Sequence, residues 1–339
     1  MNLDNLKIRN SRETLVDAKS GEFNASSKAD LKKGILAALG KPVTVDSEIS
    51  SAVREEVKAA FNDRTTNKFA TVGAAIAGEL YTAEERAGFA RRLLKKVETQ
   101  IGANIRMDVK FPNVVAVQAV SPSQVQPVFL RDKHFWPAEI DISCNLMIHK
   151  QEINTTTGDI VAEKLREAKQ ATMVQEDRLW KKAADELVGL SNSMQLLAGG
   201  LTPDSLVSMR TDVERWKLSV DKMVMATDVA NDLFGNNFSS WFDPVTKYEY
   251  ISTGKLGSIL DMEIISDANR EPTLKVLDQG DIYLIAPAEY HGGMADRGPV
   301  EATEIDGALK GQNARGWYLV ETVAMLVSNS RSFVRARRM

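Results

Sequence analysis

The sequence predicts an α+β protein, and three observations support this prediction. Residues 1 to about 104 show helical patterns joined by polar loops, rich in alanine and charge and poor in aromatic residues. A long amphipathic pattern covers 157–189. From 218 onward, short apolar strands alternate with short helices. We therefore expect a helical leader, one long central helix and an α/β C-terminal part.

Composition limits the class of protein. With 339 residues, 43% of them hydrophobic and 26% charged, the chain can form about two domains with buried cores. The net charge of −3, from 43 Lys plus Arg and 46 Asp plus Glu, disfavours a dedicated nucleic-acid-binding domain. Any DNA contact should be local and non-specific. Cys144 is the only cysteine, so no intrachain disulfide can form and a reducing compartment is expected.

No targeting or membrane segment is expected. Residues 1–4 carry no apolar run, so no signal peptide is predicted. No stretch approaches the roughly 18 apolar residues that a membrane helix needs. We expect a soluble protein that is made in a cytoplasm and has no membrane partner.

Three helices are predicted in the leader, over 32–39, 47–62 and 82–100. The third has a capping box starting at Thr82 and an apolar stripe. Its stripe consists of Phe89, Leu93, Leu94 and Val97. Because aromatic residues are few, we expect this region to be an arm that lies on other molecules and has no core of its own.

A long two-stranded excursion is predicted over 114–149. Residues 114–117 form a β-type run, and 139–149 alternate strictly with period two. The apolar positions of the second strand are Ile140, Ile142, Cys144, Leu146 and Ile148. Between the strands lies an aromatic and charged segment, 131–136. An isolated ribbon is marginally stable in water, so we expect it to rest on a neighbouring subunit.

The helix over 157–189 should be a rod of roughly 45 Å. Glu176 interrupts its apolar stripe, which predicts that one face is only partly buried. A second helix, 203–217, begins with an N-cap at Thr202 and a proline. The α/β part then has strands at 220–225, 261–265, 281–287 and 317–327, and a short helix at 226–235.

The order of these elements resembles the Hong Kong 97-type phage capsid fold. Residues 253–264, 281–287 and 315–325 are similar to three strand regions of that family, and the likeness covers about 105–339. The resemblance implies an extended loop, a peripheral domain with a spine helix, and an axial domain. The implied ranges are 1–104 for an N-terminal helical arm, 105–155 for the extended β-hairpin loop and peripheral strands, 156–217 for the peripheral domain, 218–310 for the axial domain, and 311–339 for a return strand and basic C-terminal tail.

The resemblance implies a major capsid protein that assembles as hexamers and pentamers into an icosahedral head around double-stranded DNA. Its implied partners are other copies of itself, portal and scaffolding proteins, a decoration protein where one exists, and packaged DNA. Its implied place is the virion, assembled in the host cytoplasm. An encapsulin-like nanocompartment shell protein is the alternative with the same fold. A soluble α/β hydrolase is the alternative from another class.

Two groups of residues are candidate contact sites. The first is the segment Arg131, Lys133, His134, Phe135 and Trp136, where an aromatic anchor has charged neighbours, as at protein interfaces. The alternative is a purely structural role, in which Trp136 packs on its own domain. The second is a C-terminal basic cluster, either contacting DNA phosphates or an acidic neighbour, or simply solvated. It consists of Arg331, Arg335, Arg337 and Arg338.

No catalytic, cofactor-binding or metal-binding residues are predicted. Cys144 and His149 lie five apart on one strand and so face opposite ways, which disfavours a shared metal ion. The acidic pair Glu176–Asp177 is attributed to a solvated helix face. Gly292–Gly293 lacks the spacing of a phosphate-binding loop and is interpreted as a flexible turn. The three histidines and the missing Gly-x-Ser-x-Gly elbow disfavour a hydrolase.

Some relatives cross-link a lysine to an asparagine with the help of a glutamate. Lys133 and Asn313 match the first two positions. Val320 occupies the glutamate position, and Glu321 is one residue away. Because of this departure, we expect no cross-link.

Overall fold

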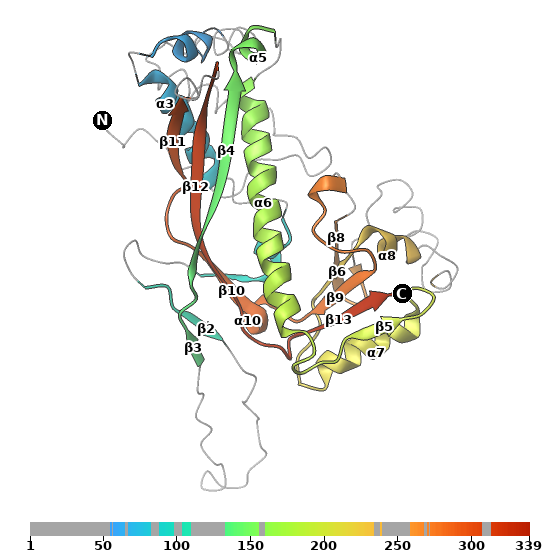
Figure 1. Ribbon diagram of the computed structural model, residues 1–339. Coiled ribbons are helices and arrows are strands. Elements are labelled where there is room, and N and C mark those ends of the chain that lie inside the picture. The colour runs from blue at the N-terminus through green and yellow to red at the C-terminus, as the bar shows by residue number, and fades with distance from the viewer. Residues whose placement is uncertain are drawn as a thin grey trace. The chain divides into compact units, whose positions relative to one another are not determined.

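A computed structural model gives the fold of the chain (Figure 1). It divides into two compact units, the first made of Met1–Ala87, Ile142–Thr172 and Pro299–Glu321, and the second of Gly88–Asp141, Met173–Gly298 and Thr322–Met339. The structure describes residues 55, 57–64, 67–82, 88–97, 104–109, 133–155, 160–233, 238, 258–267, 270, 272–306 and 313–339. The predicted helix at 32–39 and strand at 114–117 lie outside these residues.

The first unit is built on antiparallel strands. Strand β11 (Glu301–Asp306) pairs with the first part of β12 (Ala314–Val327), in a register from Glu301↔Val320 to Asp306↔Arg315. Strand β4 (Glu139–His149) also pairs with β12. Helix α3 (Lys68–Thr82) contacts β11. The short helix α5 (Lys150–Thr155) and the first half of α6 (Ile160–Leu187) complete the unit (Figure 1).

The core of the first unit contains much of the predicted arm. Residues 57–62 are helical, and together with α3 they bury their apolar side chains against β4, α6 and β12. The leader residues in this core are Val57, Ala60, Phe61, Phe69, Val72, Ile76, Ala77 and Leu80. The expectation that residues 1–104 form an arm without a core of its own is therefore wrong for 57–82. This segment is a structural part of the first unit.

The third predicted helix has the wrong limits. Thr82 ends helix α3, α4 covers only Ala90–Leu93, and Lys95–Lys96 form strand β1. The predicted stripe is nevertheless buried, because Phe89, Leu93 and Leu94 enter the core of the second unit. Helix α3 was missed because its sequence, KFATVGAAIAGELYT, is almost entirely apolar or small. It has no polar face to reveal the helical period.

The second unit contains a six-stranded sheet in the order β5-β13-β9-β6-β8-β7. Pairs β5–β13 and β6–β8 are parallel, and the other three are antiparallel. The strands are β5 (Gln195–Leu197), β6 (Lys222–Met225), β7 (Ser258–Ile259), β8 (Met262–Ser266), β9 (Asp281–Ile285) and β13 (Phe333–Arg338). Three predicted strands are thus confirmed as β6, β8 and β9. The prediction of a basic C-terminal tail is wrong, because residues Phe333–Arg338 form β13, which lies between β5 and β9 in this sheet.

Helices α7 (Pro203–Glu214) and α8 (Thr227–Asp232) accompany the sheet. The predicted start of α7 is confirmed: the Thr202 hydroxyl accepts from the amide of Ser205, and Pro203 is the first helical residue. The core between α7 and the sheet includes Leu197, Leu206, Met209, Met223, Leu284, Val334 and Ala336. A short 3-10 turn, η4 (Pro272–Leu274), and helix α10 (Ala288–His291) also belong to this unit.

The remaining strands of the second unit are β1, β2 (Met107–Val109), β3 (Lys133–Phe135) and β10 (Gly292–Asp296). Strand β10 pairs with β1 in parallel and with the end of β12 in antiparallel. The turn predicted at Gly292–Gly293 is wrong, because both glycines lie in β10. A Cβ atom on Gly292 would lie 2.0 Å from the Leu326 carbonyl oxygen, so this close approach of backbones requires glycine.

The predicted excursion is corrected in one respect. The described part of the two-stranded ribbon is β2 paired with β3, whereas β4 pairs with β12. The period-two burial predicted for β4 is confirmed at Ile142, Leu146 and Ile148, with Cys144 half-buried and Ile140 exposed. Among the described residues, no helix is long and apolar enough to cross a membrane.

Candidate functional site

The base of the ribbon is held in the second unit by its inward residues. Strands β2 and β3 are antiparallel, with Met107 opposite Phe135 and Asp108 opposite His134. Met107 is buried in a small cluster with Ile105, Ala295 and Ala324, and Phe135 is half-buried. The ribbon base therefore has a defined position on its own unit, and it presents Asp108 and His134 to solvent.

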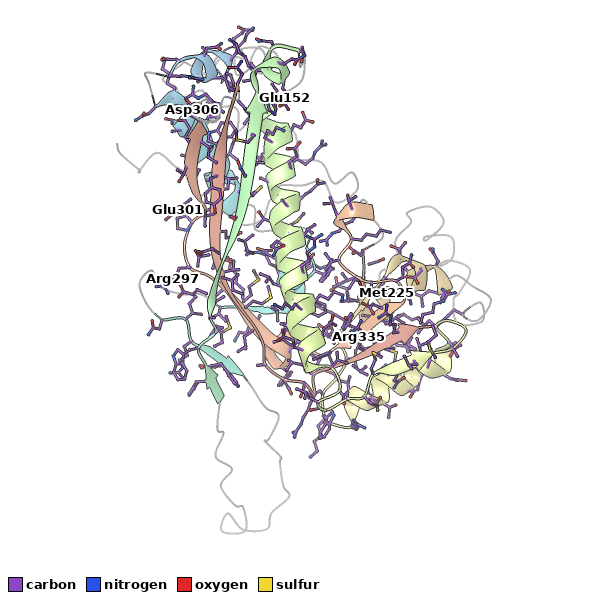
Figure 2. The ribbon with its side chains drawn as sticks, in the orientation of Figure 1. Glu152, Met225, Arg297, Glu301, Asp306 and Arg335 are labelled. Atoms are coloured by element: carbon purple, nitrogen blue, oxygen red, sulfur yellow. The ribbon has the colours of Figure 1, made fainter. Side chains whose placement is uncertain are left out.

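Trp136 follows directly after the ribbon and is 65% exposed. The alternative that it packs on its own domain is therefore wrong in the isolated chain. A few residues later Glu139, at the start of β4, forms an ion pair with Arg297, which is labelled in Figure 2. A large amphipathic ring held at the end of a strand loses little conformational entropy on binding, which suits it to an interface.

A polar cluster lies on the ribbon base. Arg106 Nε donates to Asp108 Oδ1 at 2.9 Å, and His134 Nδ1 lies 2.5 Å from the same oxygen. Arg106 Nη2 lies 3.2 Å from His134 Nε2. Hydrogen bonds from Arg106 and His134 lower the pKa of Asp108.

The other two residues of the predicted interface segment are less fully described. Arg131 lies outside the described residues. The backbone of Lys133 is part of β3, opposite Val109, but its side chain is outside what the structure describes. His134, Phe135 and Trp136 are thus the members of this segment that the structure places together.

Two of the four C-terminal arginines form ion pairs within the chain, so the solvated alternative does not hold for them. Arg335, which is labelled in Figure 2, binds Asp281 Oδ1 through Nη2 at 2.8 Å and Asp185 Oδ1 through Nη1 at 3.1 Å. Arg338 Nη1 binds Asp232 at 2.8 Å. Burial by itself lowers the pKa of Arg335, but the carboxylates around it raise the pKa overall. These two arginines are structural.

The other two C-terminal arginines remain accessible. Arg331 stacks over the Trp216 ring, with its guanidinium carbon 4.4 Å from the ring centroid. Arg337 is exposed on β13. Of the predicted cluster, Arg331 and Arg337 are therefore the members that keep an exposed cationic side chain.

Helix α6 buries two acidic side chains that were predicted to be solvated. Glu176 has no exposed surface, and Arg91 holds it with Nη2–Oε1 at 2.7 Å and Nε–Oε2 at 3.1 Å. The same guanidinium binds Asp296 through two bonds of 3.0 Å. Burial alone would lower the pKa of Arg91, but Glu176 and Asp296 raise it above its ordinary range. Periodicity could not predict this, because the partner cation is 85 residues away.

The neighbouring acid, Asp177, is buried as well. It accepts from the backbone amide of Ala90 at 2.7 Å and pairs with Arg270. Arg270 also pairs with Asp267 at 3.3 Å, and Asp267 accepts from the amides of Val276 and Leu277. Burial raises the pKa of Asp177, and the charge of Arg270 opposes this rise.

His291 is the only one of the three histidines that is fully buried. Its Nε2 accepts from Trp180 Nε1 at 3.1 Å, and its Nδ1 lies 2.8 Å from the Ser332 hydroxyl. That hydroxyl donates to the Asn329 carbonyl at 2.6 Å, so His291 Nδ1 carries the proton. Burial, aided by the charge of Lys222, lowers the pKa of His291 to about 3. The ring is a neutral structural bridge.

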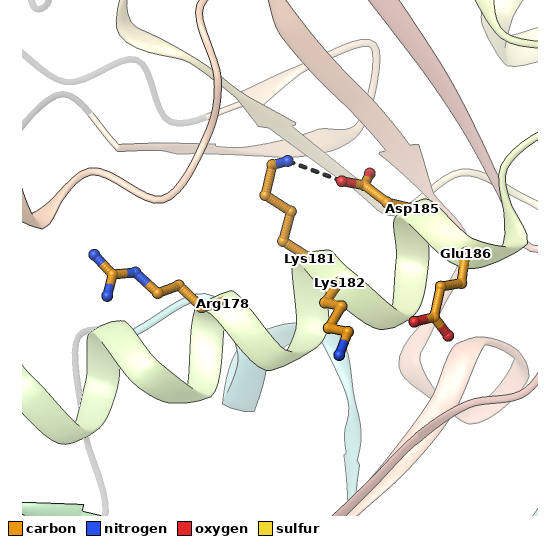
Figure 3. A pocket seen from close by; sticks show the side chains of 5 residues that line it. All are labelled: Arg178, Lys181, Lys182, Asp185 and Glu186. Atoms are coloured by element: carbon orange, nitrogen blue, oxygen red, sulfur yellow. Dashed lines mark hydrogen bonds and ion pairs between the residues drawn. The ribbon is translucent and has the colours of Figure 1, made fainter.

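An open hollow on α6 is lined by Arg178, Lys181, Lys182, Asp185 and Glu186, where Lys181 binds Asp185 at 2.8 Å (Figure 3). These five side chains include no hydroxyl, thiol or imidazole that could act as a nucleophile or a general base near neutral pH. Within the described residues, no three His, Cys, Asp or Glu side chains gather as metal ligands.

The predicted geometry around Cys144 holds. Cys144 packs against the core of the first unit, whereas His149 on the same strand is exposed. Burial raises the pKa of the Cys144 thiol, which lowers its reactivity.

Two residues considered for a cross-link are also described. Asn313 is exposed, and its backbone carbonyl accepts from the backbone amide of Lys150 at 2.9 Å. Glu321 is buried.

Comparison by sequence gives no relative: no family model matches the chain, and no curated protein matches it. Comparison by structure does. A chain from Microbacterium phage Oxtober96 has a TM-score of 0.52 at 12% identity, over 74% of this chain and 91% of that one. A chain from Mycobacterium phage Bobi has a TM-score of 0.51 at 11% identity, over 84% and 98%. At such identities the likeness shows the fold.

Proposed function

Starting from the Hong Kong 97-like capsid fold that the chain shares with these phage structures, we propose that the protein builds a closed shell from many copies of itself. Its function is structural and not enzymatic. In the finer form of the proposal, it is the major capsid protein of a tailed phage. Its hexamers and pentamers then enclose double-stranded DNA as an icosahedral head.

The exposed Trp136 surface carries the proposal. A 65% exposed tryptophan on a positioned ribbon base is costly for a free monomer and favourable for an assembling subunit. The predicted interface segment, Arg131 to Trp136, is then the contact surface with a neighbouring copy. Charged side chains around Trp136 would form the polar rim of that contact.

The predicted domains fit this role with changes. Residues 57–82 would stiffen the peripheral part, so the arm that reaches neighbours is shorter than 1–104. The sheet containing β5, β6, β9 and β13 would form the axial part, which then includes the end of the chain. Portal, scaffolding and decoration proteins remain expected partners, and the virion, assembled in the host cytoplasm, remains the expected location.

Contact with packaged DNA would involve few arginines of the predicted cluster. Arg335 and Arg338 are neutralised by Asp281, Asp185 and Asp232. Only Arg331 and Arg337 of the predicted cluster keep exposed cationic side chains. Few phosphate contacts per subunit suit a container that must hold and release its DNA, since each contact adds to affinity and salt dependence.

Electron microscopy of the protein expressed in bacteria tests the proposal. We expect closed, isometric shells. Homogeneous monomers or small oligomers under all assembly conditions, including co-expression with the proteins encoded beside it, would contradict the shell function and favour the α/β hydrolase alternative.

The contents of native particles separate the phage head from an encapsulin-like compartment. Nuclease-protected duplex DNA inside the shell is the expected result. A protein cargo in place of DNA would support the compartment, and the shared fold would stand in either case.

A further inference from the structure

Two arginines lie against one tryptophan in the second unit. The guanidinium carbon of Arg331 is 4.4 Å from the centroid of the Trp216 ring, and that of Arg215 is 5.3 Å from it. Trp216 follows α7 and packs against the apolar core of this unit, whereas both arginines are exposed. These three side chains are here called the Trp216 platform. They place two positive charges on an aromatic base.

A buried amide holds the platform in place. Asn192 is only 4% exposed, and its Oδ1 accepts from Trp216 Nε1 at 2.9 Å and from Arg215 Nη2 at 3.1 Å. Its Nδ2 donates to the Phe333 carbonyl at 2.7 Å, two residues after Arg331. One side chain thus joins the residues after α7 to the start of β13. Guanidinium groups that are already positioned lose less conformational entropy when they bind a ligand.

The charge of Arg331 is not neutralised within the described residues. Arg335 and Arg338 form ion pairs with carboxylates, and Arg215 Nη1 lies 3.5 Å from Asp212 Oδ1. The guanidinium of Arg331 contacts the Trp216 ring and pairs with no carboxylate in the part of the chain that the structure describes. Its N–H groups are therefore open to an acceptor from outside the chain.

Two hydroxyl groups lie beside the platform. Ser191 Oγ and Ser330 Oγ are 2.6 Å apart, and both residues are half-buried. Ser330 directly precedes Arg331, and the Ser191 carbonyl accepts from Arg215 Nη2 at 2.9 Å. The bond between the two hydroxyls uses one hydrogen, so the other O–H can donate to a ligand. Guanidinium and hydroxyl donors are groups that commonly bind phosphate oxygens.

We propose that the Trp216 platform and the Ser191–Ser330 hydroxyl pair form a binding site for a phosphate group. Arg331 supplies a two-pronged contact, Arg215 adds positive charge, and the hydroxyl pair adds a further donor. A phosphate has more oxygens than a carboxylate and can accept from all of these groups. The phosphate can belong to duplex DNA or be free phosphate. The DNA source rests on the proposed shell function, and the site itself does not.

Titration of the unassembled full-length protein with phosphate tests the site. The chain has five tryptophans, so nitrogen-15 labelling of tryptophan gives one indole N–H signal for each, and Trp216→Phe identifies the signal of Trp216. Sodium phosphate is compared with sodium chloride and sodium acetate at equal ionic strength and pH. We expect a saturable shift of the Trp216 signal with phosphate only, because this N–H shares the Asn192 oxygen with Arg215.

Arg331→Ala should abolish the shift, and Arg337→Ala is the matched control. Arg337 is also an exposed C-terminal arginine, but it lies on β13 opposite Leu196, so the shift should persist in its variant. The other indole signals show that each variant is folded. A Trp216 signal that does not respond to phosphate, that responds equally to acetate, or that is lost equally in both variants would overturn the site.

A short, fluorescently labelled DNA duplex separates the two sources of phosphate. If DNA is the source, Arg331→Ala should weaken duplex binding several-fold and lower the slope of log K against log salt concentration by about 1. Unchanged duplex binding, together with a phosphate shift that needs Arg331, would support the site and assign it to free phosphate. Shell formation by the same variants is scored by electron microscopy, so failure of this site and failure of the shell function are distinguished.

Discussion

The two halves of α6 bury different kinds of side chain. In the first unit the helix contributes Val161, Leu165 and Ala168 to an apolar core. In the second unit it buries Glu176 and Asp177, neutralised by arginines from elsewhere in the chain. The second half also packs apolar side chains, among them the fully buried Trp180. The comparison teaches that in the second unit the helix adds buried, paired carboxylates to its apolar packing. Buried ion pairs need both partners, so the two units should respond differently to mutation.

The largest expected effect is the loss of Arg91. Arg91→Ala removes the guanidinium that pairs with the fully buried Glu176 carboxylate, which should lower the free energy of unfolding of the unassembled subunit by about 3–5 kcal/mol in urea titrations. Arg92→Ala is the control, because its pair with Glu263 is half-exposed and should be worth no more than about 1 kcal/mol. Equal effects of the two substitutions would break the contrast.

In the first unit the corresponding test is steric. A Cβ on Gly73 would lie 2.1 Å from Trp317 Cδ1, and Trp317 stacks on Phe69 with centroids 4.4 Å apart. Gly73→Ala should therefore cost about 1–3 kcal/mol of unfolding free energy. Gly78→Ala in the same helix has nothing within 4 Å and should stabilise by about 0.5–1 kcal/mol. Thermal unfolding of both variants shows whether the signs are opposite.

The pH dependence sharpens the comparison for the second unit. The pKa of His291 is about 3 in the fold, below the ordinary value of about 6.5, so the unfolded chain takes up a proton first as pH falls. Stability should be lost from pH 6.5 down toward 3, by up to about 1.4 kcal/mol per pH unit from this group. His291→Gln keeps an acceptor for Trp180 and a donor for Ser332. Its unfolding free energy should fall less steeply than that of the unmodified protein, and parallel curves would refute the prediction.

The smallest expected effect concerns the end of α7. Lys217 has φ of 63°, a left-handed conformation that favours glycine after a helix. Lys217→Gly should stabilise the subunit by up to about 1 kcal/mol, whereas Lys217→Ala should not. Chemical denaturation of the pair measures this, and a gain with alanine would show that the backbone is not the cause.

Periodicity predicted those elements whose burial follows from their own sequence. Strands β4, β8, β9 and β12 and helices α6 and α7 have clear apolar patterns with capping or turn residues at their ends. The pattern failed where a distant residue decides the environment. Glu176 can be buried because Arg91 reaches it. Position 292 of β10 requires glycine because a Cβ atom there would collide with the Leu326 carbonyl oxygen.

The candidate site shows the same division. Trp136 was predicted as an exposed anchor because aromatic residues beside charges are typical of interfaces, and the structure leaves it exposed. The C-terminal arginines were misplaced, because β13 has only six residues and its pairing with β9 and β5 cannot be inferred from its own sequence.

An electron cryomicroscopy reconstruction of the assembled protein tests the central claim most directly. The account predicts a closed shell in which the indole of Trp136, exposed in the single chain, is buried against another copy. A reconstruction in which Trp136 faces solvent, or a protein that stays monomeric under every assembly condition, would contradict it.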